Sequence, residues 1–341
     1  MQEASHSHAL EHEHTPIYRF YPQSESVYLS AIHLYCFYDR NQFCSLSIYE
    51  WRLKLAPMNQ FRDLTGLSTF DPDEADEFKD DPLFLRSVAR TVAVLSAFQS
   101  ARHPLSLTQI ATASGLDRSA TQRIVNSLMK LGMVARDPED RGYLPGLRIL
   151  DMTHDFLRLN PMLQRANPVM LELRRRVRER VDLSLFDDIR LVYALRMPSK
   201  HEVFSATIVG NAVPTYCTAG GIAVLSRLPD DRIADIVNRS DLTPFTPYTI
   251  TDLAGVMEQV DATRRRGHSV LCRQLLAHEI AIGAPVTDAK GVPIGAIHIA
   301  GNLQEWSVES FSDNFGPLIE NAARTVSERP RPFDARNAPI V

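Results

Sequence analysis

The sequence predicts an α+β fold class, in which an N-terminal winged helix-turn-helix precedes a separate α/β domain. Three observations predict it. Two short helical segments lie on either side of a glycine between residues 105 and 130. A hairpin pattern follows directly, from 134 to 144. Beyond residue 161, apolar or alternating segments of strand length are interspersed with amphipathic helical segments.

Length and composition indicate two globular domains with a remainder. The chain has 341 residues, of which 44% are hydrophobic and 23% charged, and single domains usually have about 100–200 residues. No apolar run approaches the roughly 18–20 residues of a membrane helix, and the first residues lack the pattern of a secretory leader. The four cysteines are widely spaced, which favours reduced thiols. We therefore expect a cytoplasmic protein without a membrane partner.

We expect residues 1–82 to be a variable, disordered extension. The segment 71–81 is acidic and typical of a solvated linker. Met58 offers an alternative start, so we expect residues 1–57 to be optional. A metal-binding tail is suggested by four histidines, although their low-complexity surroundings argue against an ordered site: His6, His8, His12 and His14.

A helical segment at 87–98 is expected to supply the packing helix of the N-terminal domain. Its apolar face comprises Val88, Val92, Leu95 and Phe98. The next helix begins after Ser106, which suits an N-cap and has Gln109 three residues later, in the capping-box spacing.

The break between this helix and the following one lies at Gly115 and Leu116, and Asp117 can cap the second helix. The expected buried stripe of that helix is Ala120, Ile124, Leu128 and Leu131. Its other face consists of residue types that reach base edges and phosphates. On its own, this helix pair fits a plain helical hairpin as well as a helix-turn-helix.

The next segment favours the helix-turn-helix. Residues 134–136 and 143–144 are expected to be two short strands around a turn, which makes a winged version. Residues 83–150 contain nine basic and four acidic residues, a charge of +5; the whole chain carries −4, so the remainder carries −9. A basic segment in an acidic chain indicates nucleic-acid binding. We predict DNA contacts at Arg118, Ser119, Thr121, Gln122, Arg123, Asn126, Arg136, Arg141 and Tyr143.

Two sequence runs of the N-terminal half resemble a known family. The runs SVARTVAVLSAF at 87–98 and LTQIATASGLDRSATQRIVNSLMKLGMVARDPEDRGYLPG at 107–146 are similar to the IclR-type bacterial transcriptional regulators, and the similarity continues to about residue 327. The resemblance implies a winged helix-turn-helix at 83–146, a linker helix at 147–160, a GAF-like effector-binding domain at 161–329 and a tail at 330–341. It also implies that the linker contributes to dimer contacts.

The expected partner is double-stranded operator DNA. One recognition helix reads too few bases for useful specificity, so such proteins pair two half-sites. We therefore expect a homodimer or a dimer of dimers on a palindromic operator.

The second half shows the pattern of an α/β domain. Strands are expected at 182–186, 190–196, 279–288 and 292–300. Helices are expected at 168–181, in the later part of 214–225, and at 230–237, 252–266 and 311–326. The arginines at 174–176 fit a solvated helix face better than a nucleic-acid site, because Glu172 and Glu179 are interleaved with them.

The family resemblance also implies a pocket for a small-molecule effector. Carried over by position, its lining is Ala219, Gly220, Leu271, Glu279, Ala281, His298 and Ala300. The sequence departs from the common family pattern, which has a cysteine at position 281, serines at 298 and 300, and a lysine at Ile222. Because those serines suit a carboxylate, we expect a more apolar or aromatic effector here, with His298 as its main polar anchor.

Other functions are open on the sequence. His298 also fits a core histidine in a domain without a ligand, which describes a constitutive regulator whose C-terminal domain only oligomerises. A metal-sensing regulator would use residues that show no ligand spacing: Cys217, Cys272, His268, His278 and His298. We predict no metal site and no cofactor. Nucleotide-binding, hydrolase and zinc-protease motifs are missing, so an enzyme is not expected. The overall expectation is a ligand-responsive regulator of a catabolic operon, either repressor or activator.

Overall fold

The computed structural model describes residues 78, 80–99, 101–200 and 209–327. The histidines of the N-terminal extension, the alternative start at Met58 and the C-terminal tail lie outside the described residues. In the part of the chain that the structure describes, no helix is long and apolar enough to cross a membrane.

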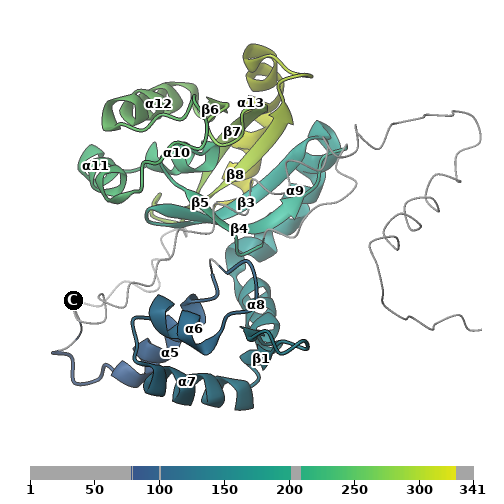
Figure 1. Cartoon of the computed structure of the whole chain (residues 1–341). Coiled ribbons are helices and arrows are strands. Elements are labelled where there is room, and N and C mark those ends of the chain that lie inside the picture. Colours follow the sequence, from purple (N-terminus) through teal and green to yellow (C-terminus); the bar gives the residue numbers. More distant parts are fainter. Residues whose placement is uncertain (1–77, 79, 100, 201–208, 328–341) are drawn as a thin grey trace, which may run out of the picture. The chain divides into compact units, whose positions relative to one another are not determined.

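The N-terminal domain contains three helices and a two-stranded hairpin (Figure 1), as the sequence predicts. The helices are α5 (Arg86–Ser96), α6 (Leu107–Ala113) and α7 (Arg118–Lys130), and the strands are β1 (Val134–Arg136) and β2 (Tyr143–Pro145). Ser106 and Gln109 form the expected capping box of α6. Asp117 caps α7 by accepting the backbone N–H of Ala120.

Two details of this domain's core differ from the prediction. In α5 the buried residues are Ala89, Ala93 and Val94, whereas Val88 and Val92 are exposed. In α7 the buried set is Ala120, Thr121, Val125 and Leu128, and Leu131 lies past the helix end with 61% of its surface exposed. Leu95, Phe98 and Ile124 remain partly buried against this core, so the buried face of each helix is rotated relative to the expected one but overlaps it.

Helices α8 (Arg148–Leu159) and α9 (Pro161–Val177) follow, and Asn160 separates them. The Asn160 carboxamide oxygen accepts the backbone N–H groups of Met162 and Leu163, so the residue expected to end the linker also starts the next helix. The prediction that this helix spans 168–181 is wrong: α9 begins at Pro161 and contains Pro168 in its interior.

The C-terminal domain is built on a six-stranded antiparallel sheet with the order β5-β4-β3-β8-β7-β6. The strands are β3 (Arg180–Asp187), β4 (Arg190–Met197), β5 (Ala212–Pro214), β6 (Ser269–Cys272), β7 (Glu279–Thr287) and β8 (Pro293–Asn302). Four of them match the strands expected from the sequence, and the two short edge strands, β5 and β6, were not expected. The fold class, α+β with a winged helix-turn-helix and an α/β domain, is confirmed.

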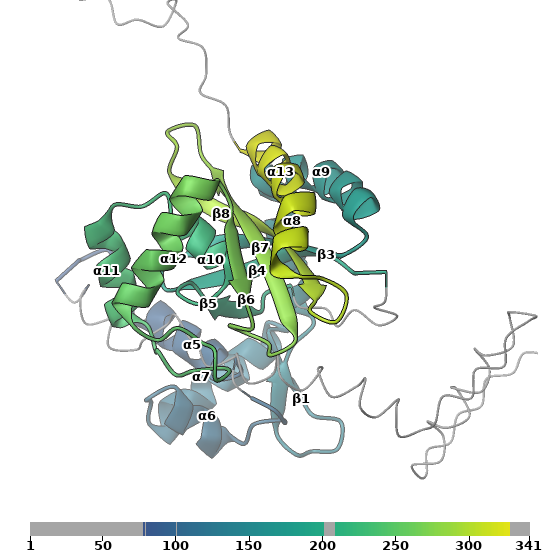
Figure 2. The same ribbon diagram turned by 90° about the horizontal axis from the view of Figure 1, so that it is seen from above.

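Helices cover both faces of this sheet (Figure 2). On one face, α9 and α13 (Val308–Val326) pack on apolar side chains of the central strands, such as Leu183, Ile282 and Ile297. On the other face lies α10 (Ala219–Leu225), with α11 (Asp230–Arg239) and α12 (Leu253–Arg266) outside it. The sheet face beneath α10 carries the polar residues of the candidate site.

Candidate functional site

The exposed face of α7 presents most of the residues predicted to contact DNA. Arg118, Ser119, Gln122, Arg123 and Asn126 are all exposed. The side chains of these five residues make no hydrogen bond to any described residue, which leaves them free to contact a partner.

Thr121 is the exception, and its assignment to the exposed face is wrong. Its side chain is buried in the core, and its Oγ1 donates to the backbone oxygen of Asp117 at 2.9 Å. A short β-branched residue with a local backbone acceptor is compatible with burial in a helix, so the polarity of Thr121 does not place it on the surface.

The arginines of the wing are paired with the acids of the turn. Arg141 Nε donates to Asp137 Oδ2 at 2.9 Å, and Arg136 Nε donates to Asp140 Oδ1 at 2.7 Å. The Arg136 guanidinium also lies over the Tyr143 ring, 4.8 Å from its centroid. The Asp137 carboxylate, 3% exposed, accepts the backbone N–H groups of Glu139 and Arg141. The wing arginines therefore brace the turn and have much of their charge offset locally.

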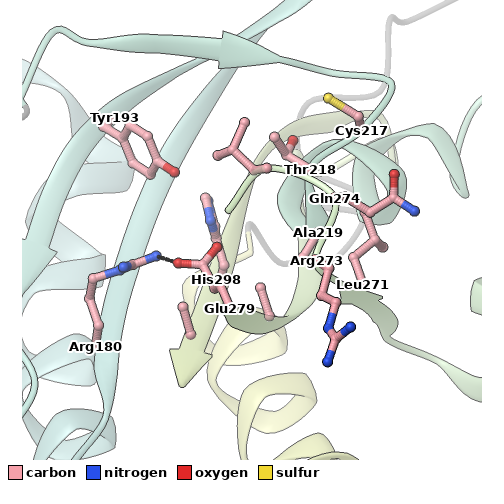
Figure 3. Close-up of a pocket in the computed structure, with 13 residues that line it drawn as sticks. Arg180, Tyr193, Cys217, Thr218, Ala219, Leu271, Arg273, Gln274, Glu279 and His298 are labelled. Carbon is pink, nitrogen blue, oxygen red and sulfur yellow. Dashed lines mark hydrogen bonds and ion pairs between the residues drawn. The ribbon is translucent and has the colours of Figure 1, made fainter. Parts of the chain in front are cut away.

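A second candidate site is a cavity between the sheet and the start of α10 (Figure 3). Six of the seven residues predicted for the effector pocket line it: Ala219, Leu271, Glu279, Ala281, His298 and Ala300. Gly220 lies directly behind the lining, where an added Cβ would come within 2.9 Å of His298 Nε2. Residues that are far apart in the chain therefore meet here.

The cavity is narrow in this structure. The space among its lining residues is about 380 Å³, which includes open solvent, and only about 20 Å³ of it can hold the centre of a water molecule. The smaller of these two volumes decides which ligands fit, because pockets that hold a small organic ligand usually have about 300–1,000 Å³. A bound ring compound must therefore displace some of the lining side chains.

A network of charged side chains lies at one end of the cavity. Arg180 donates to Asp182 Oδ2 at 3.0 Å and to Glu279 Oε2 at 2.6 Å, while Arg196 makes two bonds to Asp182 at 2.7 and 2.9 Å. Burial alone would raise the pKa of the Asp182 carboxyl, but the guanidinium groups of Arg196 and Arg180 outweigh it and hold that pKa below its usual range.

His298 and Tyr193 lie between this network and α10. His298 Nε2 is 2.7 Å from Ser184 Oγ, and its ring centroid is 5.5 Å from that of Tyr193. Burial lowers the pKa of His298 to about 4, and it raises the pKa of Tyr193 above its usual range. Both side chains are therefore uncharged at neutral pH.

The depressed pKa of His298 predicts how stability depends on pH. The unfolded chain takes up a proton at this residue below about pH 6.5, whereas the folded chain does so only near pH 4. Stability is therefore lost as the pH falls through this window, by about 3 kcal/mol from this residue. Urea unfolding of the wild type and His298→Gln at several pH values should show a shallower pH dependence in the variant. Equal slopes in this window would contradict the assignment.

Several lining residues were missed by the sequence analysis, among them Arg180, Tyr193, Thr218 and Arg273. One signal was available: Arg180, Asp182 and Ser184 alternate with apolar residues, which places three polar groups on one face of a strand. The partners on β4 and β7 gave no such signal, because strand order and register cannot be read from a single strand.

A metal centre finds no support in the described residues, where no three His, Cys, Asp or Glu side chains form a group that could hold an ion. His268 is instead bonded to Glu320 through Nδ1, at 2.8 Å, and to Ser312 through Nε2, at 2.9 Å. Burial raises the pKa of the Cys217 thiol to about 12, so this cysteine is not a thiolate at neutral pH.

Comparison with known proteins identifies both domains. Residues 154–328 match the model of the bacterial transcriptional regulator IclR C-terminal domain, and residues 87–138 match the IclR helix-turn-helix domain.

This chain aligns with most of the length of two curated relatives. The HTH-type transcriptional regulator Rv1719 of Mycobacterium tuberculosis is 32% identical over 65% of this chain and 90% of its own. The p-hydroxybenzoate hydroxylase transcriptional activator of Acinetobacter baylyi is 25% identical over 74% of this chain and 94% of its own. A crystal structure of a transcriptional regulator from Rhodococcus is similar with a TM-score of 0.61 at 26% identity, over 71% of this chain and 97% of that one.

Proposed function

Because the chain belongs to the IclR family of bacterial transcriptional regulators, we propose that it is a ligand-responsive regulator of a catabolic operon in the cytoplasm. Its α7 helix reads operator DNA, and its C-terminal domain senses a small aromatic or apolar effector. The observation that supports the ligand most directly is the cavity beneath α10, where polar and charged side chains converge on a space inside a folded domain.

The relative from Acinetobacter supports the catabolic role, because its name describes an activator for a hydroxylase that acts on an aromatic acid. Effector binding would change operator affinity through its different affinity for two arrangements of the protein. A second candidate function is a constitutive regulator whose C-terminal domain only oligomerises. The observation in its favour is the narrowness of the cavity.

We also propose that the protein acts as a homodimer or a dimer of dimers. The apolar side chains of α8 support this, since the helix has no buried residue and exposes Leu150, Met152, Phe156 and Leu159. A contiguous exposed apolar face of this kind marks an interaction surface, and paired half-sites on DNA require two copies of α7.

Variants on the exposed face of α7 test the DNA-binding assignment. Gln122→Ala should reduce discrimination between the preferred operator and other duplexes by about 1–3 kcal/mol, if its amide makes a bidentate base contact. Arg123→Ala should weaken binding to all duplexes and lower the salt slope by about one unit, because it removes one phosphate contact. The measurement is binding of the full chain to a selected operator and to a random duplex over a range of salt concentrations.

Arg141→Ala is the matched control on the wing. Its charge is already offset by Asp137 and Glu139, so the salt slope should change less than in Arg123→Ala. The division of roles on α7 is wrong if Gln122→Ala and Arg123→Ala lose affinity equally on both duplexes.

A further inference from the structure

Among the described residues, the buried charges around the cavity are equal in number and paired with one another. Two arginines, Arg180 and Arg196, face two carboxylates, Asp182 and Glu279, and every one of these four side chains is at least nearly nine-tenths buried. Arg273 is the third charged residue of the lining, beside Arg180 and Glu279; it is exposed and donates to the Tyr248 hydroxyl at 3.1 Å. Figure 3 shows its guanidinium directed away from Tyr193 and His298.

This balance works against an anionic ligand. A carboxylate entering the cavity would add a negative charge next to Glu279, which already bonds Arg180. His298 cannot supply a compensating positive charge at neutral pH, because its imidazole is uncharged there. An uncompensated buried charge is costly, since it loses its hydration without gaining a free partner.

Two uncharged polar atoms point into the cavity without a partner. Every fully buried side-chain nitrogen or oxygen in the described part of the chain has a hydrogen-bond partner, yet no described residue bonds Tyr193 Oη or His298 Nδ1. These two atoms therefore face open space, although Tyr193 is only 4% exposed and His298 only 6%. Figure 3 shows the Tyr193 hydroxyl and the His298 ring directed toward the same region between β4, β8 and α10.

These two atoms match a hydroxyl group better than a carboxylate. The neutral imidazole offers Nδ1 as an acceptor in one tautomer and as a donor in the other, and a tyrosine hydroxyl can do either. A ligand hydroxyl both donates and accepts, so it can satisfy both atoms in either arrangement. A carboxylate only accepts, so it can satisfy both atoms in just one arrangement, with the proton on His298 Nδ1.

The remaining walls suit a flat apolar group. Ala281 and Ala300 are paired across β7 and β8, and Ala219, at the start of α10, also lines the cavity. These methyl groups, the aromatic ring of Tyr193 and the aliphatic Leu271 make part of the wall apolar, and a ring that enters displaces some of the lining because the cavity is narrow.

We propose that the effector is an uncharged phenol, bound with its hydroxyl between Tyr193 Oη and His298 Nδ1, and that Glu279 is the residue that excludes carboxylates. This inference rests on the proposed function, because it names the ligand class of the same cavity. It assigns Glu279 a role in specificity and Tyr193 a role in binding.

Two probes that differ only in the polar group on the ring test the proposal: 4-methylphenol and 4-methylbenzoate, titrated calorimetrically into the full chain at neutral pH. The wild type should bind 4-methylphenol at least about tenfold more tightly than 4-methylbenzoate. Tyr193→Phe should lose about tenfold in affinity for 4-methylphenol, because it removes one hydrogen bond and keeps the ring. In Glu279→Gln the cluster has an excess positive charge, so affinity for 4-methylbenzoate should rise about tenfold or more.

The matched control is Glu172→Gln, which removes a carboxylate from an exposed position outside the cavity. It should bind the two probes like the wild type. Circular dichroism of each variant verifies folding, and the wild-type comparison alone already tests the ligand class.

Three results would overturn the proposal. Tighter binding of 4-methylbenzoate by the wild type would refute the phenol assignment while leaving a small-molecule effector in place. An unchanged preference in folded Glu279→Gln would refute the role of Glu279. If neither probe binds the wild type, and neither changes its affinity for operator DNA, both this inference and the ligand-responsive part of the proposed function fail.

Discussion

Replacing Asp182 with alanine is expected to lower the free energy of unfolding by about 3–5 kcal/mol. The Asp182 carboxylate is buried and accepts three hydrogen bonds, one from Arg180 and two from Arg196. Its removal leaves buried positive charge that Glu279 alone does not balance. Urea unfolding of the full chain, followed by circular dichroism at neutral pH, measures the change.

Asp187→Ala is the matched control, because it removes a carboxylate from the end of the same strand. Asp187 is half exposed and pairs with Arg190 at 2.8 Å, and exposed ion pairs contribute about 0–1 kcal/mol. If both variants lowered the free energy of unfolding by the same amount, the buried position of Asp182 would add nothing to its contribution to stability.

Replacing Gly221 with alanine is expected to destabilise the C-terminal domain by about 3 kcal/mol, at the upper end of the usual cost of overpacking. An added Cβ would lie 1.8 Å from the backbone oxygen of Thr215 and 2.6 Å from its carbonyl carbon. Backbone atoms cannot rotate away as a flexible side chain can, so α10 must shift. Because α10 covers the cavity, 4-methylphenol binding should weaken as well.

Gly291→Ala is the control for this substitution. Gly291 has a φ of +83°, and an added Cβ there would meet nothing within 4 Å. The expected loss is about 1–2 kcal/mol from the left-handed backbone alone. Thermal unfolding of both variants measures the difference, and an equal loss would show that the close approach of α10 to Thr215 can relax.

The sequence determined the local structure well. Capping signals at Ser106 and Asp117, the glycine at 115 and the hairpin at 134–145 lie where local hydrogen bonds fix the backbone, and the structure confirms each of them. Such signals are short in range, so a few neighbouring residues suffice to specify them. Two local expectations are wrong: Thr121 is buried and Val88 is exposed, because neither polarity nor size alone decides which face of a helix is buried.

The candidate pocket was only partly accessible from the sequence. The family resemblance supplied Glu279 and His298, but not Arg180 and Tyr193, which meet them in space. The pairing of β3 with β8 sets Asp182 opposite His298, and the pairing of β3 with β4 sets Ser184 opposite Tyr193. These long-range pairings depend on which strands become neighbours, and no local pattern encodes that.

The charge on the wing shows the same distinction. In the sequence, Arg136 and Arg141 are two of the nine basic residues that give residues 83–150 a positive net charge. Only the folded turn shows that Asp137 and Asp140 hold these arginines at hydrogen-bond distance. Local spacing thus determines the helices and the hairpin of the N-terminal domain, and the resemblance of its sequence runs indicates the family. The tertiary structure decides which charges are paired and which polar atoms stay free, because both depend on distances across the chain.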